Sequence, residues 1–286
     1  MPKLLAEDIK TREVLDWQGV HLLHFSGSSC SQKLRIFLNL KGIDWVSHPV
    51  DLAAQANFEP WFLGINPRGL VPVLVHDGAV HIESNDILAY LERVFPEPGL
   101  IPSGKDEETL RILEEEDDLH LDVRALTMRF VVPRKLAEKS PARLTAYRED
   151  AGTIGGEADP HKAVELGFWQ DFARQGITDE QVRRSAGKFH RAYGDLEKML
   201  EVRRYLLGDE LSIVDVAWFI YTHRLSVAGY PFRRLHPRVD AWYRGLSSRE
   251  EFSSEVRTPP LLRAITAALH ASQAIRRESL ERVSGL

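Results

Sequence analysis

The sequence contains a single cysteine, Cys30, among its 286 residues. One thiol cannot form a disulfide within the chain or supply the several ligands of a structural zinc site, and it is compatible with a reducing compartment. Long apolar runs are also missing. The most apolar stretch near the C-terminus, residues 261–274, contains Arg263 and His270 and is shorter than the roughly 18 to 20 apolar residues that a membrane span requires.

A secretory signal and a large excess of one charge are missing as well. Residues 1–17 alternate charged and apolar side chains, so no targeting segment is visible and we expect a soluble, cytoplasmic protein without a membrane span. The net charge of −5 is small and is not gathered in blocks. Neither nucleic acid nor an anionic membrane is therefore an expected partner.

The sequence contains eleven histidines but no H-E-x-x-H motif. His21 and His24 point to opposite faces of a predicted strand, so they cannot bind one metal together. We therefore expect no metal site.

What is present indicates two domains, since 286 residues exceed one ordinary domain. The first 95 residues alternate strand and helix signals, and Asp77-Gly78 between two apolar runs predicts a hairpin. The predicted order is βαβαββα, the thioredoxin-like layout. The predicted strands span residues 20–25, 45–50, 73–76 and 79–82, and the predicted helices span residues 31–41, 58–65 and 85–95.

Beyond residue 95 the pattern changes to helices. Residues 96–104 hold three prolines and two glycines and predict a linker. Helical spacing then recurs in residues 106–132, 179–201, 212–228, 238–246 and 260–283. The expected organisation is therefore an α/β domain over residues 1–95, of which 1–18 are an extension, a linker over 96–105, and an all-α domain over 106–286 with an amphipathic tail. Residues 133–177 are polar, and no element is predicted there.

The first candidate site is the polar cluster Ser28, Ser29 and Cys30, which lies between a predicted strand and a predicted helix. Unpaired N–H groups and a partial positive charge at a helix N-terminus stabilise an anion, and a thiolate is such an anion. The structural alternative is a serine N-cap beside a small buried cysteine. Spacing along a helix favours this buried position for Cys30, because its side chain points about 200° away from that of Ser28.

Two further segments of the same predicted domain suit a peptide ligand. Pro72 precedes a strand and is a candidate cis proline, which would leave the backbone of Val71 free to pair with an extended peptide; an ordinary loop proline is the alternative. Ser84 is expected to cap the next helix, and its hydroxyl with the helix N–H groups also suits a carboxylate. Glu83 beside it can accept from an ammonium group. A zwitterionic amino-acid head group would satisfy both residues.

In the helical region Asp117, His120, Arg124 and Met128 recur at spacings of 3, 4 and 4, which places them on one face of the helix predicted for residues 106–132. Such a stripe is either a solvated face or the lining of a substrate pocket.

These segments together resemble the glutathione transferase superfamily. Ser28-Ser-Cys-Ser and the following L-R-I-F-L-N-L-K-G-I-D are similar to the zeta-class motif, and Asn66-Pro-Arg-Gly-Leu-Val-Pro-Val-Leu and Glu83-Ser84 are similar to the glutathione-binding segments of the family. Tyr205-Leu-Leu-Gly-Asp-Glu-Leu-Ser-Ile-Val-Asp-Val-Ala resembles the helical-domain motif, and its residues predict a capping box between Ser212 and Asp215. The likeness covers residues 20–101 closely and 196–252 loosely.

The resemblance implies glutathione as cosubstrate, a small hydrophobic electrophile, detoxification and a homodimer. Carried over by position, Ser28 activates the thiol, Val71 beside Pro72 pairs with the cysteinyl backbone, and Glu83 and Ser84 hold the γ-glutamyl group. Asn57 or Gln55 reaches the glycine end. Because the first helix of the second domain flanks the cleft in this family, the stripe of Asp117, His120, Arg124 and Met128 is a candidate lining of the electrophile pocket.

The chain also departs from the zeta pattern in its longer N-terminus, the extra residues 133–177 and its tail. Residues 57–62 and 222–225 resemble glutathione-dependent dehalogenases, β-etherases and ganglioside-induced differentiation-associated proteins, and in the dehalogenase branch a cysteine matching Cys30 is catalytic. Three hypotheses follow: a glutathione transferase using Ser28, a glutathione-dependent lyase, reductive dehalogenase or β-etherase using Cys30, and a non-catalytic binding module.

Overall fold

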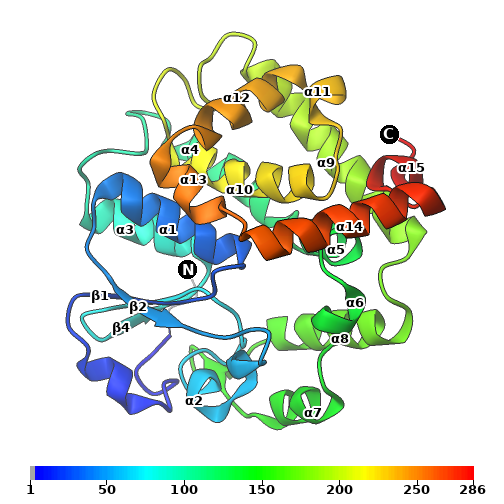
Figure 1. Ribbon diagram of the computed structural model, residues 1–286. Coiled ribbons are helices and arrows are strands. Elements are labelled where there is room, and N and C mark those ends of the chain that lie inside the picture. Colours follow the sequence, from blue (N-terminus) through cyan, green and yellow to red (C-terminus); the bar gives the residue numbers. More distant parts are fainter. Residues whose placement is uncertain (1–3) are drawn as a thin grey trace. The chain divides into compact units, whose positions relative to one another are not determined.

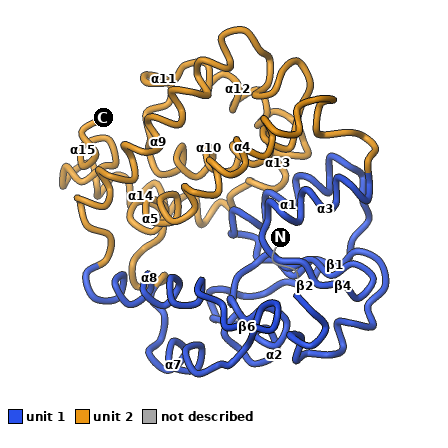
Figure 2. The backbone as a smooth tube through the Cα atoms, turned by 180° about the vertical axis from the view of Figure 1, so that it is seen from behind, with its two compact units in different colours: residues 1–95, 138–175 blue, residues 96–137, 176–286 orange. Residues whose placement is uncertain are grey.

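The structure is a computed structural model that describes residues 4–286 (Figure 1). The chain forms two compact units. Of the described residues, 4–95 and 138–175 form one unit, and 96–137 and 176–286 form the other (Figure 2). Among the described residues, no helix combines the length and the apolar character needed to cross a membrane.

The first unit is built on a four-stranded sheet with the strand order β2-β1-β3-β4. Strand β1 (Val20–His24) is parallel to β2 (Val46–Pro49) and antiparallel to β3 (Val73–His76), which pairs with β4 (Ala79–His81). The β3–β4 turn consists of Asp77 and Gly78, whose φ angles of 48° and 74° are both positive, as a two-residue hairpin of this kind requires. The predicted hairpin is confirmed.

The helices of this unit complete the predicted βαβαββα order. Helix α1 (Ser29–Lys41) ends at Gly42, which has the left-handed φ of 63°, and it packs against α3 (Ser84–Val94). The single helix predicted over residues 58–65 is instead two short elements, η2 (Ala56–Phe58) and α2 (Pro60–Leu63). Proline has no N–H to donate within a helix, so Pro60 begins a new helix instead of continuing the first.

Residues 138–175, for which no element was predicted, fold with the first unit. They form α7 (Pro141–Glu149), a hairpin of β5 (Thr153–Ile154) and β6 (Glu157–Ala158), and α8 (His161–Gln175). The ring of Tyr147 is fully buried and stacks on Phe58 with centroids 4.8 Å apart. Burial of these aromatic side chains explains why the segment belongs to this unit rather than to the helical one.

The N-terminal extension is tied to the inserted hairpin by one buried carboxylate. Asp8 accepts hydrogen bonds from Thr153 Oγ1 at 2.6 Å, Gly155 N at 2.8 Å and Gly156 N at 3.0 Å. The extension continues as η1 (Arg12–Asp16) before β1. Two segments that depart from the zeta pattern thus hold each other in place.

The second unit is all-helical within its described residues, as predicted. Its elements are α4 (Asp106–Asp117), α5 (His120–Phe130), α6 (Arg134–Ala137), α9 (Asp179–Met199), α10 (Ile213–Val227), α11 (Phe232–Leu235), α12 (Pro237–Ser247), α13 (Glu250–Val256), α14 (Pro260–Arg276) and α15 (Leu280–Ser284). Helix α10 forms the centre of the unit, and most of its residues are buried. At its start Asp215 accepts from Ser212 N at 3.0 Å, which confirms the predicted pairing of these residues.

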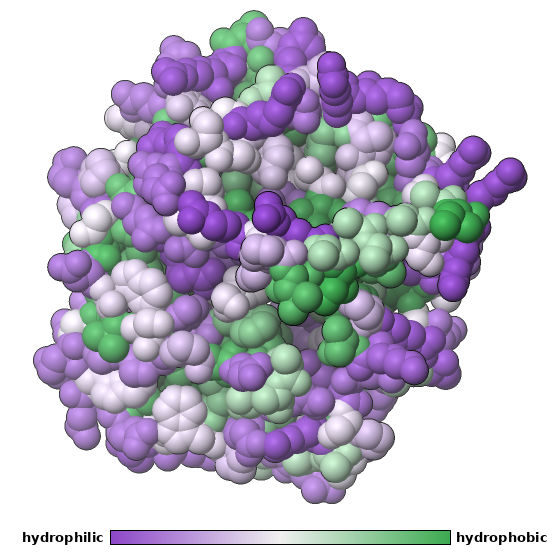
Figure 3. Space-filling view, viewed as in Figure 1, coloured by the Kyte–Doolittle hydropathy of each residue, from purple (hydrophilic) through white to green (hydrophobic). Residues whose placement is uncertain are grey.

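Two predicted helices of this unit are interrupted. The helix expected over residues 106–132 breaks between α4 and α5, directly after the acidic run 114–118. Negative side chains are unfavourable at a helix C-terminus, which already has a partial negative charge. The tail predicted over residues 260–283 breaks at Arg277, whose φ is 59°. Helix α14 has no buried residue, and its Leu261 and Leu262 are exposed. Figure 3 shows apolar surface along the course of this helix.

Candidate functional site

Ser28 lies at the turn between β1 and α1 and acts as the N-cap of α1. Its Oγ accepts a hydrogen bond from Ser31 N at 3.3 Å, so the capping interpretation is confirmed. A serine hydroxyl also carries one proton to donate, and within residues 4–286 the Ser28 hydroxyl donates to no acceptor. The side chain is half-buried, and it can therefore cap the helix and still donate to a bound anion.

Arg35, on the buried face of α1, holds this turn in place. Its guanidinium donates to Phe25 O at 3.3 Å and to Ser26 O at 3.2 Å, the carbonyls of the two residues that precede Gly27. It also donates to His24 Nδ1 at 3.0 Å, which leaves the proton of that ring on Nε2, facing Ser47 Oγ at 2.8 Å. Burial and the charge of Arg35 lower the pKa of His24 to about 4, so this ring is neutral near pH 7.

The role of Arg35 in holding the turn before α1 was not predicted from the sequence. A charged residue among the apolar positions of a helix was the available signal, because Arg35 stands between Leu34 and Ile36, which are both fully buried.

Cys30 and Ser29 occupy the first turn of α1, and both are half-buried. The expectation of a buried Cys30 is therefore not met. Ser28 has an extended backbone with φ −79° and ψ 127°, so the turn before the helix is not helical and Cys30 does not sit in the core. As the single cysteine of the sequence, Cys30 forms no disulfide within the chain.

The Val71–Pro72 peptide bond is cis, as the candidate interpretation required. Val71 lies just before β3, and its N–H and C=O form no hydrogen bond with any part of the chain that the structure describes. An extended peptide can pair with such a backbone segment in the manner of a β-strand.

Glu83 and Ser84 lie at the start of α3. The prediction that Ser84 caps this helix is wrong: Glu83 is the N-cap residue, without a side-chain capping bond, and Ser84 is the first helical residue. The backbone of Glu83 has φ 67°, a region that non-glycine residues seldom occupy and that is frequently found at binding sites. The Ser84 hydroxyl makes no hydrogen bond inside the described chain.

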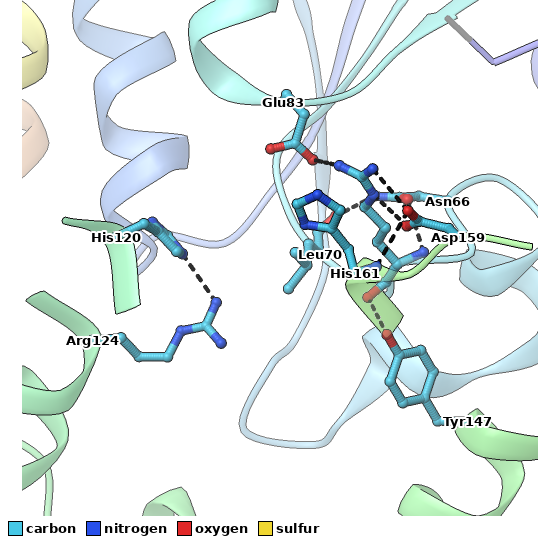
Figure 4. A network of polar contacts seen from close by, with 9 residues as sticks. Asn66, Leu70, Glu83, His120, Arg124, Tyr147, Asp159 and His161 are labelled. Carbon is cyan, nitrogen blue, oxygen red and sulfur yellow. Dashed lines mark hydrogen bonds and ion pairs between the residues drawn. The ribbon is translucent and has the colours of Figure 1, made fainter. Parts of the chain in front are cut away.

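Glu83 is joined to the inserted segment through Arg68. The guanidinium donates from Nη1 to Glu83 Oε1 at 2.5 Å, from Nε to Asp159 Oδ2 at 2.5 Å and from Nη2 to Asp159 Oδ1 at 3.1 Å. Figure 4 shows this network, in which Tyr147 donates its hydroxyl to the carbonyl of Arg68 at 2.8 Å. Burial opposes the charge of Arg68, but its hydrogen bonds to Asp159 and Glu83 outweigh burial and raise its pKa.

The two residues predicted at the glycine end are engaged with the protein's own backbone. Asn57 Nδ2 donates to Gly69 O at 2.7 Å, and Gln55 Oε1 accepts from Ser140 N at 3.1 Å. Their role in ligand binding stays a prediction.

The predicted stripe is divided between two helices. Asp117 ends α4 and is exposed, whereas His120, Arg124 and Met128 share a face of α5, so the placement of all four on one helix is wrong. Arg124 donates to His120 Nε2 at 3.0 Å (Figure 4). His120 Nδ1 lies 3.3 Å from Tyr221 OH. These residues form a polar cluster of the second unit. Separately, no group of histidine, cysteine, aspartate or glutamate side chains within residues 4–286 is arranged to hold a metal ion.

Comparison with known proteins finds two domain matches. Residues 27–94 match the glutathione S-transferase N-terminal domain, and residues 179–245 match the glutathione S-transferase C-terminal domain. The whole inserted segment, residues 138–175, therefore lies outside both matches. Residues 27–94 and 179–245 are thus similar to the two domains of glutathione S-transferases.

Individual relatives cover different parts of the chain. It is 44% identical to glutathione S-transferase 1 of Dianthus caryophyllus over 93 residues, which are 32% of this chain and 42% of that protein. The chain thus spans less than half the length of this relative. It is 27% identical to maleylacetoacetate isomerase of Pseudomonas aeruginosa over 76% of this chain and 83% of that protein. The crystal structure of the β-etherase LigF from Sphingobium sp. strain SYK-6 superposes with a TM-score of 0.70 at 26% identity, covering 83% of this chain and 98% of that one.

Proposed function

We propose that the protein binds glutathione in its first unit and activates the thiol for attack on a small hydrophobic electrophile. The observation that carries this proposal is the Ser28 hydroxyl, which accepts from the helix backbone and keeps its own proton for a ligand. A free thiol of pKa about 8.5 is only about 3% ionised at pH 7, and lowering the pKa by about two units, worth about 2.7 kcal/mol, makes thiolate the major form. A hydroxyl donor and a helix N-terminus both act in that direction.

The remaining contacts orient the tripeptide. The unpaired Val71 backbone binds the cysteinyl residue, Ser84 and the N-terminus of α3 bind the γ-glutamyl carboxylate, and Glu83 binds the ammonium group. Asn57 or Gln55 reaches the glycine end by analogy with the family. The second unit supplies the electrophile site, for which His120 and Arg124 with Met128 are the candidates.

The test is glutathione binding followed by a substrate screen. The thiolate absorbance of bound glutathione, titrated against pH, should show a midpoint below that of free glutathione. Aryl halides, β-aryl ethers and maleyl compounds should then be assayed with glutathione, and sedimentation would test the proposed homodimer. Retention of glutathione without turnover of any of these compounds would favour a binding module instead.

A second candidate is a lyase or reductive dehalogenase that uses Cys30. The half-buried thiol and the likeness to LigF support it. In the reductive reaction the Cys30 thiolate attacks the sulfur of a glutathionyl substrate, the carbon–sulfur bond breaks and the carbon takes a proton. The thiolate of a second glutathione then attacks the glutathione sulfur of the mixed disulfide. This step releases the Cys30 thiolate and forms oxidised glutathione. Oxidised glutathione as a stoichiometric product would identify this reaction.

A further inference from the structure

The inserted segment contributes one buried charge to the region around Glu83. Asp159 lies just before α8, its side chain is 7% exposed, and both of its carboxylate oxygens accept from Arg68. Other acidic residues of the segment, such as Asp150, serve different partners. Asp159 is therefore placed to act on Arg68 and, through it, on Glu83.

Arg68 has two carboxylate partners, and this number decides how strongly it neutralises Glu83. With Asp159 present, two of its nitrogens face Asp159 and one faces Glu83. The group Glu83–Arg68–Asp159 thus carries two negative charges and one positive charge, a net charge of about −1. Without Asp159 the arginine and Glu83 would form a neutral pair, and the attraction of this group for a cation would fall. Asp86, which also interacts electrostatically with Glu83 and Arg68, would remain in both cases.

Glu83 is also the member of this group that can reach a ligand. Its side chain is 34% exposed, whereas those of Arg68 and Asp159 are each 7% exposed. Arg68 occupies Oε1 of Glu83, and Oε2 forms no hydrogen bond with the residues that the structure describes. An ammonium group can therefore approach Oε2, and the two buried members set the charge behind it. Figure 4 shows the carboxylates of Glu83 and Asp159 on either side of the guanidinium.

We propose that Asp159 is a positioning and specificity-determining residue, which keeps Glu83 available and negatively charged toward the α-ammonium group of glutathione. This inference rests on the proposed function, since it takes Glu83 as the head-group ligand. It assigns to residues 138–175 a part in ligand selection, in addition to their packing on the first unit.

The experiment compares glutathione with glutathione acetylated at its α-amino group, which has the same peptide but no ammonium charge. Dissociation constants for both ligands are measured by calorimetry for the wild type, Asp159→Asn and the matched control Asp150→Asn. Asp150 belongs to the same segment, but its carboxylate pairs with Lys162 and Lys10 and not with Arg68.

We expect the wild type and Asp150→Asn to prefer glutathione over the acetylated form, and Asp159→Asn to lose about ten-fold of this preference through weaker binding of glutathione alone. Equal weakening for both ligands would show a merely structural role and overturn the inference, as would an unchanged preference. Should Asp159→Asn fail to fold, Asp159→Glu preserves the charge and should keep the preference, so a loss of preference in this folded variant would overturn the inference.

The variant Glu83→Gln separates this inference from the proposed function. If Glu83→Gln keeps the wild-type preference, the head-group site is wrongly placed. The part of the proposed function that makes Glu83 the ligand of the ammonium group is then refuted. If Glu83→Gln loses the preference and Asp159→Asn keeps it, the head-group site stands and only the role of Asp159 is refuted.

Discussion

Replacement of Ser28 should separate catalysis from folding, because one function of this hydroxyl is observed and a second is proposed. As an acceptor it caps α1 through Ser31 N, and as a donor we propose that it binds the thiolate. Ser28→Ala removes both. Loss of an N-cap serine to alanine costs about 1 kcal/mol of stability, and loss of one donor to a developing anion lowers kcat by roughly 10² to 10³. Glutathione affinity should stay within a few fold, because the hydroxyl matters mainly for the thiolate.

Three further variants of Ser28 make the test specific. Ser28→Gly lacks the hydroxyl but costs only a few tenths of a kcal/mol as a cap, so it should be as inactive as Ser28→Ala and more stable. Ser28→Asp keeps an acceptor for the helix but places a negative charge near the thiolate, so it should fold and remain inactive. Ser28→Thr keeps both functions and should retain most activity. Stopped-flow turnover, thermal unfolding and the thiolate titration are measured for each, and unchanged turnover in Ser28→Ala would refute the serine assignment.

Three other predictions concern the residues around this turn. Arg35→Met removes the hydrogen bonds to the Phe25 and Ser26 carbonyls and should lower kcat by about ten-fold with a reduced melting temperature; Arg35→Lys should recover part of both, and an equal kcat in all three proteins would contradict the positioning role. Cys30→Ser should keep most activity if Ser28 activates the thiol, whereas a stalled glutathione adduct seen by mass spectrometry would favour the Cys30 reaction. Because the folded-state pKa of His24 is about 4 and its usual value is 6.5, the unfolded chain binds the proton first as the pH falls. The contribution of His24 to stability is therefore complete above pH 6.5 and is lost between about pH 6.5 and 4, and chemical denaturation at several pH values should show this slope in the wild type but not in a folded His24→Gln variant.

Features that depend on a few neighbouring residues could be predicted from the sequence. Asp77-Gly78 predicted the hairpin because few other residue pairs accept two positive φ angles, and Gly42 predicted the end of α1 for the same reason. Ser28 before an apolar-periodic run predicted the N-cap and the start of that helix. The order of elements in the first unit followed from such local signals, and with it the placement of Ser28, Val71 and Glu83 in one unit.

Features that depend on distant residues were decided only by the tertiary structure. Arg68 and Asp159 are 91 residues apart, and Asp8 and Gly155 are 147 residues apart, so no local pattern connects them. The first residue of α3 was also not predictable from the local sequence. The N-cap is Glu83 rather than Ser84, and its backbone has a φ of 67°. The choice of a turn or cap residue changes stability by about 1 kcal/mol and depends on neighbouring residues alone. A buried charge such as that of Asp159 requires a charged partner, and only the folded chain can bring that partner to it.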